Sequence, residues 1–206
     1  MIFHFDNIAA TLISGVIVLM LVGMQMRSRE VNIEQTAFVT AKGQALELGD
    51  WLQQDLGNAG AGVPINEQFI EDYEVDAVTE NTKRFSFQRK ISEADAAPTL
   101  ITYELLEGET IVVKGDTVQL YQVQRCEGAA TCPAGSSDVN GKSPAGLTYF
   151  RIDLLDENGG AWTAGTSNAY YLRIRFSITS SFGLSDRDHL RETHWGTVLP
   201  VRARDS

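Results

Sequence analysis

The N-terminal part of the chain is a long run of apolar residues without a single charged side chain. It extends from Ile8 to Met26 and reads IAATLISGVIVLMLVGMQM, with Gln25 as its one strongly polar residue. Each helical residue adds about 1.5 Å, so the run would form a helix about 28 Å long. This length is close to the hydrocarbon thickness of a bilayer, which is about 30 Å. The run therefore predicts an apolar helix that requires a membrane or another apolar environment.

The residues that follow are predicted to continue this helix with a single apolar face. Residues 1–56 contain no proline, and apolar residues recur every three or four positions, which is the spacing of one helical face. The sequence GNAGAG favours a helix end at Gly57. We expect the apolar face, together with Trp51, to be buried on a sheet. The face comprises Phe38, Ala41, Ala45, Leu48, Leu52 and Leu56.

The second part of the chain alternates apolar and polar residues with a period of two, which is typical of β-strands. Pro200 favours an edge position for the last strand, because proline has no N–H group to donate. The Gly-, Ser- and Pro-rich residues 127–146 are expected to form an exposed loop, and EGE, KGD and Asn158-Gly159 to form turns. The predicted strands are residues 84–91, 99–106, 110–114, 117–124, 147–155, 170–180 and 194–202.

The same alternation assigns side chains to the two faces of the predicted sheet. Arg173, Arg175 and Ser177 are expected to face outward, because successive side chains of a strand point to opposite faces. The residues expected to face the core are Phe85, Phe87, Phe150, Ile152, Leu154, Leu172, Ile174, Phe176, Ile178, Trp195, Thr197, Leu199 and Val201.

These patterns predict an α+β fold in which a long N-terminal helix packs on an antiparallel β-sheet. A chain of 206 residues is long enough for one domain and an appended helix. We divide it into an apolar helix at residues 1–26, its amphipathic continuation at 27–57, a linker at 58–65 and a globular β domain at 66–206.

The two cysteines, Cys126 and Cys132, lie in the sequence RCEGAATCP. Their spacing is wider than that of a C-x-x-C redox or zinc pair, and no histidine is near them in sequence. A disulfide that closes a small loop is one interpretation. It would place this domain in an oxidising compartment, outside the cytoplasmic membrane. Two free thiols in a cytosolic loop are the alternative.

The formal net charge of the chain is −10. An acidic surface repels phosphate groups, so we expect no nucleic-acid binding through a broad electrostatic surface. His189 and His194 do not have the spacing of a zinc-protease motif, and we expect neither enzymatic activity nor a cofactor. The acidic residues 153–158 offer oxygen ligands of the kind that Ca²⁺ prefers. A solvated Asn-Gly turn explains the same residues, so no metal site is assigned.

The helix end and the strand sequences together have the pattern of a known family. The charge-free helix continues to ALELGDWLQQDLGNAGAG, and the strands include TLITYELLEGETIVV, GLTYFRIDLLDENGGAW, AYYLRIRFSIT and ETHWGTVLPVRAR. With these features the chain resembles type IV pilins and type II secretion pseudopilins. The helix end is most similar to W-type minor pilins and J-type pseudopilins.

This resemblance implies a structural role without catalysis. The chain would be a subunit of an extracellular pilus-like filament at the cell surface, a homo-oligomer that polymerises through its N-terminal helices. Before assembly it would be anchored in the inner membrane, from which the pilus assembly machinery extracts it. The alternative is a minor pilin or pseudopilin at a filament tip, which primes assembly or binds a partner of a secretion or DNA-uptake machine through residues 126–146.

Asp6 is a carboxylate beside the apolar run, where an unpaired charge is costly to bury. The resemblance implies that Asp6 pairs with a free α-amino group and so sets the axial register of the subunits. The alternative is that Asp6 caps the helix N-terminus. Small residues along the run offer surfaces for close helix packing. The alternative is that the run is a plain single-span membrane anchor. We assign assembly to Phe3, Phe5, Asp6, Gly15 and Gly23.

Arg27 and Arg29 follow the apolar run, while no Lys or Arg precedes it. The positive-inside rule alone would therefore place the β domain in the cytoplasm. The proposed disulfide implies the opposite side of the membrane. We expect this conflict to be resolved by a basic leader that is removed after it has set the orientation, or by export through another dedicated route.

Overall fold

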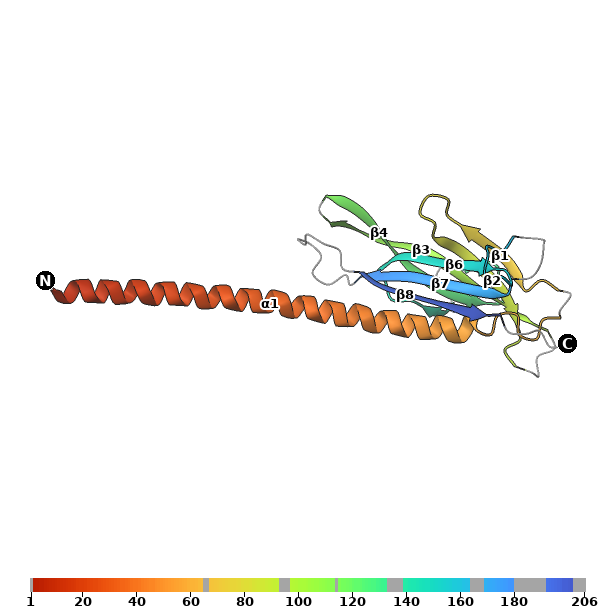
Figure 1. Cartoon of the computed structure of the whole chain (residues 1–206), viewed down its shortest axis with the longest axis horizontal. Helices are drawn as coiled ribbons and strands as arrows, with labels where there is room; N and C mark the ends of the chain where they lie inside the picture. Colours follow the sequence, from red (N-terminus) through yellow and green to blue (C-terminus); the bar gives the residue numbers. More distant parts are fainter. Residues whose placement is uncertain are drawn as a thin grey trace.

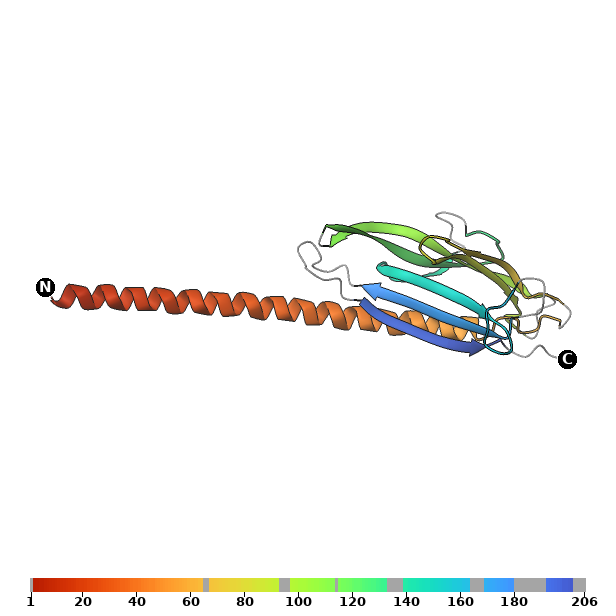
Figure 2. The same cartoon turned by 45° about the horizontal axis from the view of Figure 1, so that its top comes forward.

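The computed structural model contains one long helix and an antiparallel sheet of eight strands, which confirms the predicted α+β class (Figure 1). Helix α1 (Ile2–Leu56) lies along the sheet with its second half, while its first half projects beyond the sheet (Figures 1 and 2). The backbone alone is described at residues 2–6, 139 and 140. The structure describes residues 2–64, 67–92, 97–113, 115–132, 139–163, 169–179 and 192–201.

Neighbouring strands of the sheet are antiparallel and follow the order β1-β2-β3-β4-β6-β7-β8, with β5 paired to β4. The last strand is an edge strand that ends at Pro200, as its proline predicts. The strands are β1 (Ile70–Val75), β2 (Thr82–Arg89), β3 (Thr99–Val113), β4 (Asp116–Glu127), β5 (Val139–Lys142), β6 (Leu147–Leu155), β7 (Tyr171–Thr179) and β8 (Glu192–Pro200).

The end of α1 at Leu56 agrees with the sequence prediction. The turn that follows contains Gly60 and Gly62 with φ values of +76° and +68°, which glycine adopts without strain. Ala59 and Val63 are buried in the core. The segment between helix and sheet therefore packs with the domain and fixes the direction in which α1 leaves it.

The predicted apolar face of α1 is buried on the sheet with one exception. Phe38 is 47% exposed, so the prediction for this residue is wrong. It lies where the sheet begins to cover α1, and the adjacent Ala37 is the residue that is buried there. Trp51 is partly buried and lies against Tyr103 of β3 and Gly141 of β5. The buried residues of the face are Ala41, Ala45, Leu48, Leu52 and Leu56.

The side chains predicted to face the core are buried in β2, β6 and β7, which confirms that assignment. In β8, Leu199 is buried, and Trp195 is partly buried and stacks on Phe176 with 5.1 Å between the ring centroids. Ser177 was expected to face outward but is buried, and its hydroxyl pairs with that of Thr148 at 2.8 Å. The buried residues are Phe85, Phe87, Phe150, Ile152, Leu154, Leu172, Ile174, Phe176 and Ile178.

The sequence EGE lies within β3, so the prediction of a turn there is wrong. The pairing of β3 with β4 shifts register between Glu107 and Thr110, around Gly108. A glycine inside a strand is as compatible with such a bulge as with a turn. The KGD turn is confirmed, since Gly115 has a φ of +87° and β4 begins directly after it at Asp116.

Two strands, β1 and β5, lie outside the predicted set. β1 has the sequence IEDYEV, in which charged residues obscure the alternation. β5 lies within residues 127–146 and pairs with β4, for example through Gly141 and Arg125, so the prediction of a wholly exposed loop is wrong. A strand of four residues that includes a glycine is too short to show a clear alternation of apolar and polar residues.

The sheet is divided into two parts that meet at a seam between β4 and β6. These two strands pair at one register position, Tyr121 with Leu147. Further along, the free edge of β6 is hydrogen-bonded by side chains from the other part of the sheet. Asn81 Oδ1 accepts from the Phe150 N–H at 3.0 Å, and Thr82 Oγ1 accepts from the N–H of the next inward residue, Ile152, at 2.9 Å.

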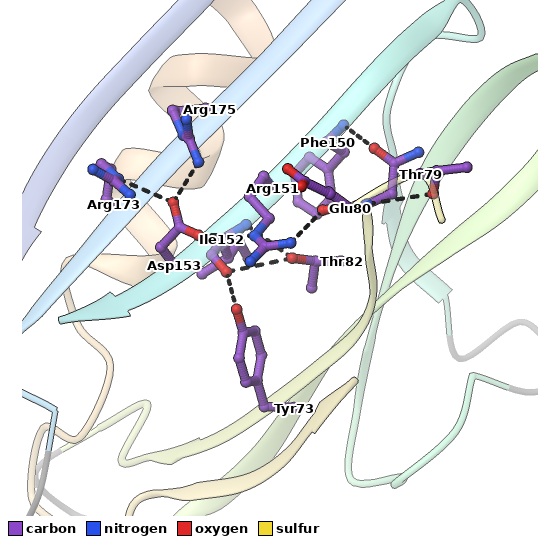
Figure 3. Close-up of polar contacts among 11 residues, drawn as sticks. Tyr73, Thr79, Glu80, Thr82, Phe150, Arg151, Ile152, Asp153, Arg173 and Arg175 are labelled. Carbon is purple, nitrogen blue, oxygen red and sulfur yellow. Dashed lines mark hydrogen bonds and ion pairs between the residues drawn. The ribbon is translucent and has the colours of Figure 1, made fainter. Parts of the chain in front are cut away.

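Tyr73 of β1 completes the seam by donating its hydroxyl to the Ile152 carbonyl oxygen at 2.7 Å (Figure 3). Burial raises the pKa of Tyr73, which keeps the phenol protonated as a donor. Buried backbone groups require partners, and here side chains from β1, from β2 and from the connection between them provide these partners in place of a neighbouring strand.

Asp55, in the last turn of α1, is buried and joins the helix end to the sheet. Arg125 Nε of β4 donates to Asp55 Oδ2 at 2.6 Å, and Arg89 Nη2 of β2 lies 2.6 Å from Asp55 Oδ1. The hydroxyl of Tyr103 also donates to Asp55. Burial and the adjacent carboxylate raise the pKa of Tyr103 well above its ordinary value. Burial lowers the pKa of Arg125, but its bonds to Asp55 and Glu127 raise it more.

Replacing Asp55 by alanine would leave two largely buried guanidinium groups without their shared carboxylate. We expect Asp55→Ala to lower the free energy of unfolding by about 3 to 5 kcal/mol, measured by urea unfolding of the full chain in detergent. The exposed Asp50, one turn earlier on the same helix, provides the control. Asp50→Ala should change stability by about 0.5 kcal/mol or less. Equal effects of the two substitutions would contradict the role assigned to Asp55.

Gly49 is where α1 approaches β8 most closely. A Cβ added to Gly49 would lie under 3.0 Å from three atoms of the Trp195 ring, whereas a Cβ added to Gly43 meets no atom within 4 Å. We expect Gly49→Ala to lower the free energy of unfolding by about 1 to 3 kcal/mol through overpacking. Gly43→Ala should raise it by about 1 kcal/mol, because alanine favours the helix. A stabilising Gly49→Ala, in the same urea titration, would show that the close contact is absent.

Candidate membrane and assembly surface

The first half of α1 exposes its apolar side chains on all sides. The large apolar residues from Ile8 to Met26 are 44–73% exposed. No other described part of the chain covers them, because the sheet begins beyond this half of the helix (Figure 1). An exposed apolar surface of this extent marks a site of contact with a membrane or with another protein.

By length and composition this helix could cross a membrane. The most apolar window of α1 has none of its residues buried, so the segment is not the core helix of the β domain. Arg27 and Arg29 lie exposed just after the apolar run, where long cationic side chains reach the aqueous interface of a bilayer. The N-terminal helix is therefore a potential membrane anchor.

Gly15 and Gly23 interrupt this apolar surface with two small positions. A Cβ on either glycine would meet no atom of the chain within 4 Å. Packing within a single copy therefore does not require glycine at either position. Close approach of a second helix is one use for such positions, and this role remains a prediction.

Phe3, Phe5 and Asp6 belong to the first two turns of α1, and their side chains lie outside the described part of the structure. Since α1 already begins at Ile2, Asp6 stands in the second turn and not at the N-cap position. Its capping role remains as untested as its assembly role. Its pairing with an α-amino group remains a prediction.

Cys126 and Cys132 form a disulfide, as predicted, with their Cα atoms 5.6 Å apart. Both residues are buried. The Cys132 N–H donates to Glu104 Oε2 at 3.2 Å, which holds the closed loop on β3. The disulfide favours an oxidising compartment for this end of the molecule.

The acidic residues 153–158, to which no metal site was assigned, include two carboxylates that contact other groups of the chain. Asp153 is bound by arginines within the sheet, while Asp156 Oδ1 accepts the N–H groups of Asn158 and Gly160 at 2.9 and 2.8 Å. The described residues contain no group of three or more His, Cys, Asp or Glu that could hold a metal ion. His189 lies outside the described residues, and the His194 side chain is 75% exposed.

Asp153 of β6 is surrounded by three arginines on the outward face of the sheet, a group we call the arginine cluster (Figure 3). Its carboxylate lies 2.8 Å from Arg151 Nε, 2.9 Å from Arg173 Nε and 2.8 Å from Arg175 Nη2. Burial raises the pKa of Asp153, but these arginines lower it more, so the pKa lies below its ordinary value. Arg151 Nη1 also donates to the Glu80 carbonyl oxygen at 2.6 Å.

The opposite arrangement occurs on the other part of the sheet, where one arginine is surrounded by three carboxylates. In this carboxylate cluster, Arg84 Nη1 of β2 lies 3.1 Å from Asp72 Oδ2 and 3.8 Å from Glu74 Oε2. Arg84 Nη2 lies 3.7 Å from Glu104 Oε1. The cluster borders a cleft of about 270 Å³, which Glu107 also lines.

Sequence reasoning found neither cluster. The alternation in β7 placed Arg173 and Arg175 on the outward face, but their common partner Asp153 is on β6. The register that brings Arg173 opposite Asp153 follows from strand pairing, which single strands do not reveal.

No family model, curated protein or solved structure matches this chain. The apolar half of α1, the disulfide and the two ionic clusters are therefore the features on which a function has to rest.

Asp153 gives a pH-dependent contribution to stability whose sign follows from its lowered pKa. The ionised carboxylate stabilises the fold above the unfolded-state pKa of about 3.9, and this contribution is lost as the pH falls below it. We expect Asp153→Asn to reduce the free energy of unfolding by about 1.5 to 3 kcal/mol at pH 7. The difference from the unchanged chain should shrink at pH 3, measured by urea unfolding in detergent.

The exposed Asp116 at the start of β4 provides the control for this titration. Asp116→Asn should alter stability by about 0.5 kcal/mol or less at both pH values. An Asp153→Asn effect of the same size at pH 7 and pH 3 would show that the arginine cluster does not depend on the carboxylate charge.

Proposed function

We propose that this chain is the structural subunit of an extracellular type IV pilus-like filament. In this proposal α1 anchors the chain in the inner membrane before assembly and then packs with the α1 helices of other copies. The observation that carries the proposal is the exposed apolar surface from Ile8 to Met26, which continues without a break into a helix half packed on the sheet.

The continuity of α1 supports a filament more than a simple anchor. The helix has 55 residues in one segment, about 80 Å by helical rise. Because its second half is fixed on the sheet, the apolar half leaves the β domain in a defined direction (Figures 1 and 2). A flexible tether would suffice to hold a domain at a membrane, whereas a regular helical array needs each domain at a fixed position relative to its helix.

The composition of the apolar half supports transfer from lipid to a helix bundle. Both environments are apolar, so moving the helix between them exposes little apolar surface to water. Gly15 and Gly23 would allow neighbouring helices to approach closely. Asp6 would be paired in the bundle with the α-amino group of a subunit, which would remove the cost of an isolated buried charge. The disulfide supports a location of the β domain outside the cytoplasm.

The proposal is tested by a substitution that lipid tolerates and a close helix bundle does not. Gly15→Leu adds an apolar side chain into open space, so folding and membrane insertion should remain unchanged. We expect about tenfold fewer fibres, because the added side chain separates neighbouring helices. Fibres would be counted by electron microscopy of the cell surface, and the membrane fraction would be measured by immunoblot.

Val16→Leu is the matched control, because it changes an exposed apolar residue next to Gly15 while leaving the glycine in place. It should retain both membrane insertion and fibre formation. The proposal fails if cells producing the unchanged chain form no fibre that contains it. The proportion of this chain in purified fibres separates a main subunit from a minor subunit at the tip.

A further inference from the structure

We propose that neighbouring copies of this chain bind one another through their two ionic clusters, the arginine cluster of one copy against the carboxylate cluster of the next. The inference rests on the proposed function for the nature of the partner, which is a second copy of the chain. It adds a contact between β domains to the contact between apolar helices.

The arginine cluster has an excess of positive charge and of hydrogen-bond donors. Three guanidinium groups share the one carboxylate of Asp153, so two positive charges are left over. The side chains of Arg173 and Arg175 are 43% and 45% exposed, and each contacts Asp153 through a single nitrogen. A guanidinium has five N–H donors and can bind one carboxylate through two parallel N–H···O hydrogen bonds. The remaining outward N–H groups can therefore donate hydrogen bonds to further carboxylates.

The carboxylate cluster has the complementary excess. Asp72, Glu74 and Glu104 share the single cation of Arg84, which leaves two negative charges. The Asp72 and Glu74 side chains are 43% and 50% exposed. The cleft beside them is also lined by Glu107 and by Lys83, whose charge is paired with Asp76 at 2.8 Å, and it offers space for a further cationic side chain. A guanidinium from outside would find carboxylates there already held in place by Arg84.

One copy does not bring its own clusters together. The arginine cluster lies on β6 and β7, the carboxylate cluster on β1 to β3, and no ion pair joins them among the residues that the structure describes. When two copies bind through two different surfaces, one copy keeps its arginine cluster free and the other copy keeps its carboxylate cluster free. Such heterologous contacts produce open rows or helices unless they close into a ring.

Charge complementarity favours a second copy as the partner. The chain has a net charge of −10, so two copies repel each other over most of their surfaces. The arginine cluster is an exception, because it carries an excess of positive charge. It favours the orientation of two copies in which it lies against the carboxylate cluster of the other copy. Both parts of the sheet lie beside the second half of α1 (Figures 1 and 2). Copies anchored through α1 therefore present their clusters on the same side of the membrane, at high local concentration.

The test uses full chains in phosphatidylcholine vesicles and measures energy transfer between donor- and acceptor-labelled copies. The unchanged chain should give transfer that falls in 1 M NaCl, because salt screens exposed charges. Arg173→Glu with Arg175→Glu should reduce transfer about fivefold or more, as should Glu74→Arg with Glu104→Arg. An equal mixture of the two double variants should restore it, because each copy then carries a cluster that complements the other.

Two controls keep the result interpretable. Lys42→Glu and Glu47→Arg reverse exposed charges of the same kinds on α1 and should leave transfer unchanged. Arg173→Gln with Arg175→Gln removes the charges without placing further carboxylates beside Asp153, and thermal melting verifies that the variants fold. Folded glutamine variants with the transfer of the unchanged chain would overturn the inference. Absence of transfer between unchanged copies, with binding of a poly-glutamate peptide to them, would overturn it in favour of another acidic partner.

The outcome is independent of whether fibres form. Energy transfer with the expected charge dependence, in cells that form no fibre, would leave the cluster contact standing while the proposed filament fails. Fibres that form equally well from the charge-reversal variants would leave the filament standing while the cluster contact fails.

Discussion

The packing of the second half of α1 on the sheet is the contact on which the rest of the structure depends. One continuous helix meets two environments, and among the residues that the structure describes only this half has a partner. Its apolar face is buried, its end is held through Asp55 by Arg89 and Arg125, and Gly49 permits close approach of Trp195. Because the helix cannot bend freely where it is packed, this contact also sets the direction of the exposed apolar half.

The division of the sheet has a counterpart in the distribution of charge. The part formed by β6 to β8 carries arginines in excess around Asp153, and the part formed by β1 to β5 carries carboxylates in excess around Arg84. In each cluster one central side chain, Asp153 or Arg84, holds the side chains of opposite charge in position. The chain as a whole is acidic, but charge is distributed unevenly across the β domain. The net charge of the sequence does not reveal this uneven distribution.

The sequence predicted what depends on local pattern. The helix, its end at Leu56, the core-facing residues of β2, β6 and β7 and the disulfide follow from spacing along the chain. The prediction failed where a residue's environment is decided by distant strands: Phe38 lies at the margin of the sheet, EGE is a bulge within β3, and β5 is held by pairing with β4. Both ionic clusters are of this second kind, because their members come from separate strands and meet only through register.

The seam between β4 and β6 and the end of α1 together determine how the domain would carry mechanical load. A pull on α1 enters both parts of the sheet, through the contacts of the helix with β7 and β8 and through Asp55, which is bound by Arg89 of β2 and Arg125 of β4. Apart from this bridge, the two parts meet at the seam. There, one backbone register pair and the side chains of Tyr73, Asn81 and Thr82 take the place of a full ladder. The end of α1 therefore spans the place where the sheet is least continuous, so a pull on the helix is shared between the two parts of the sheet.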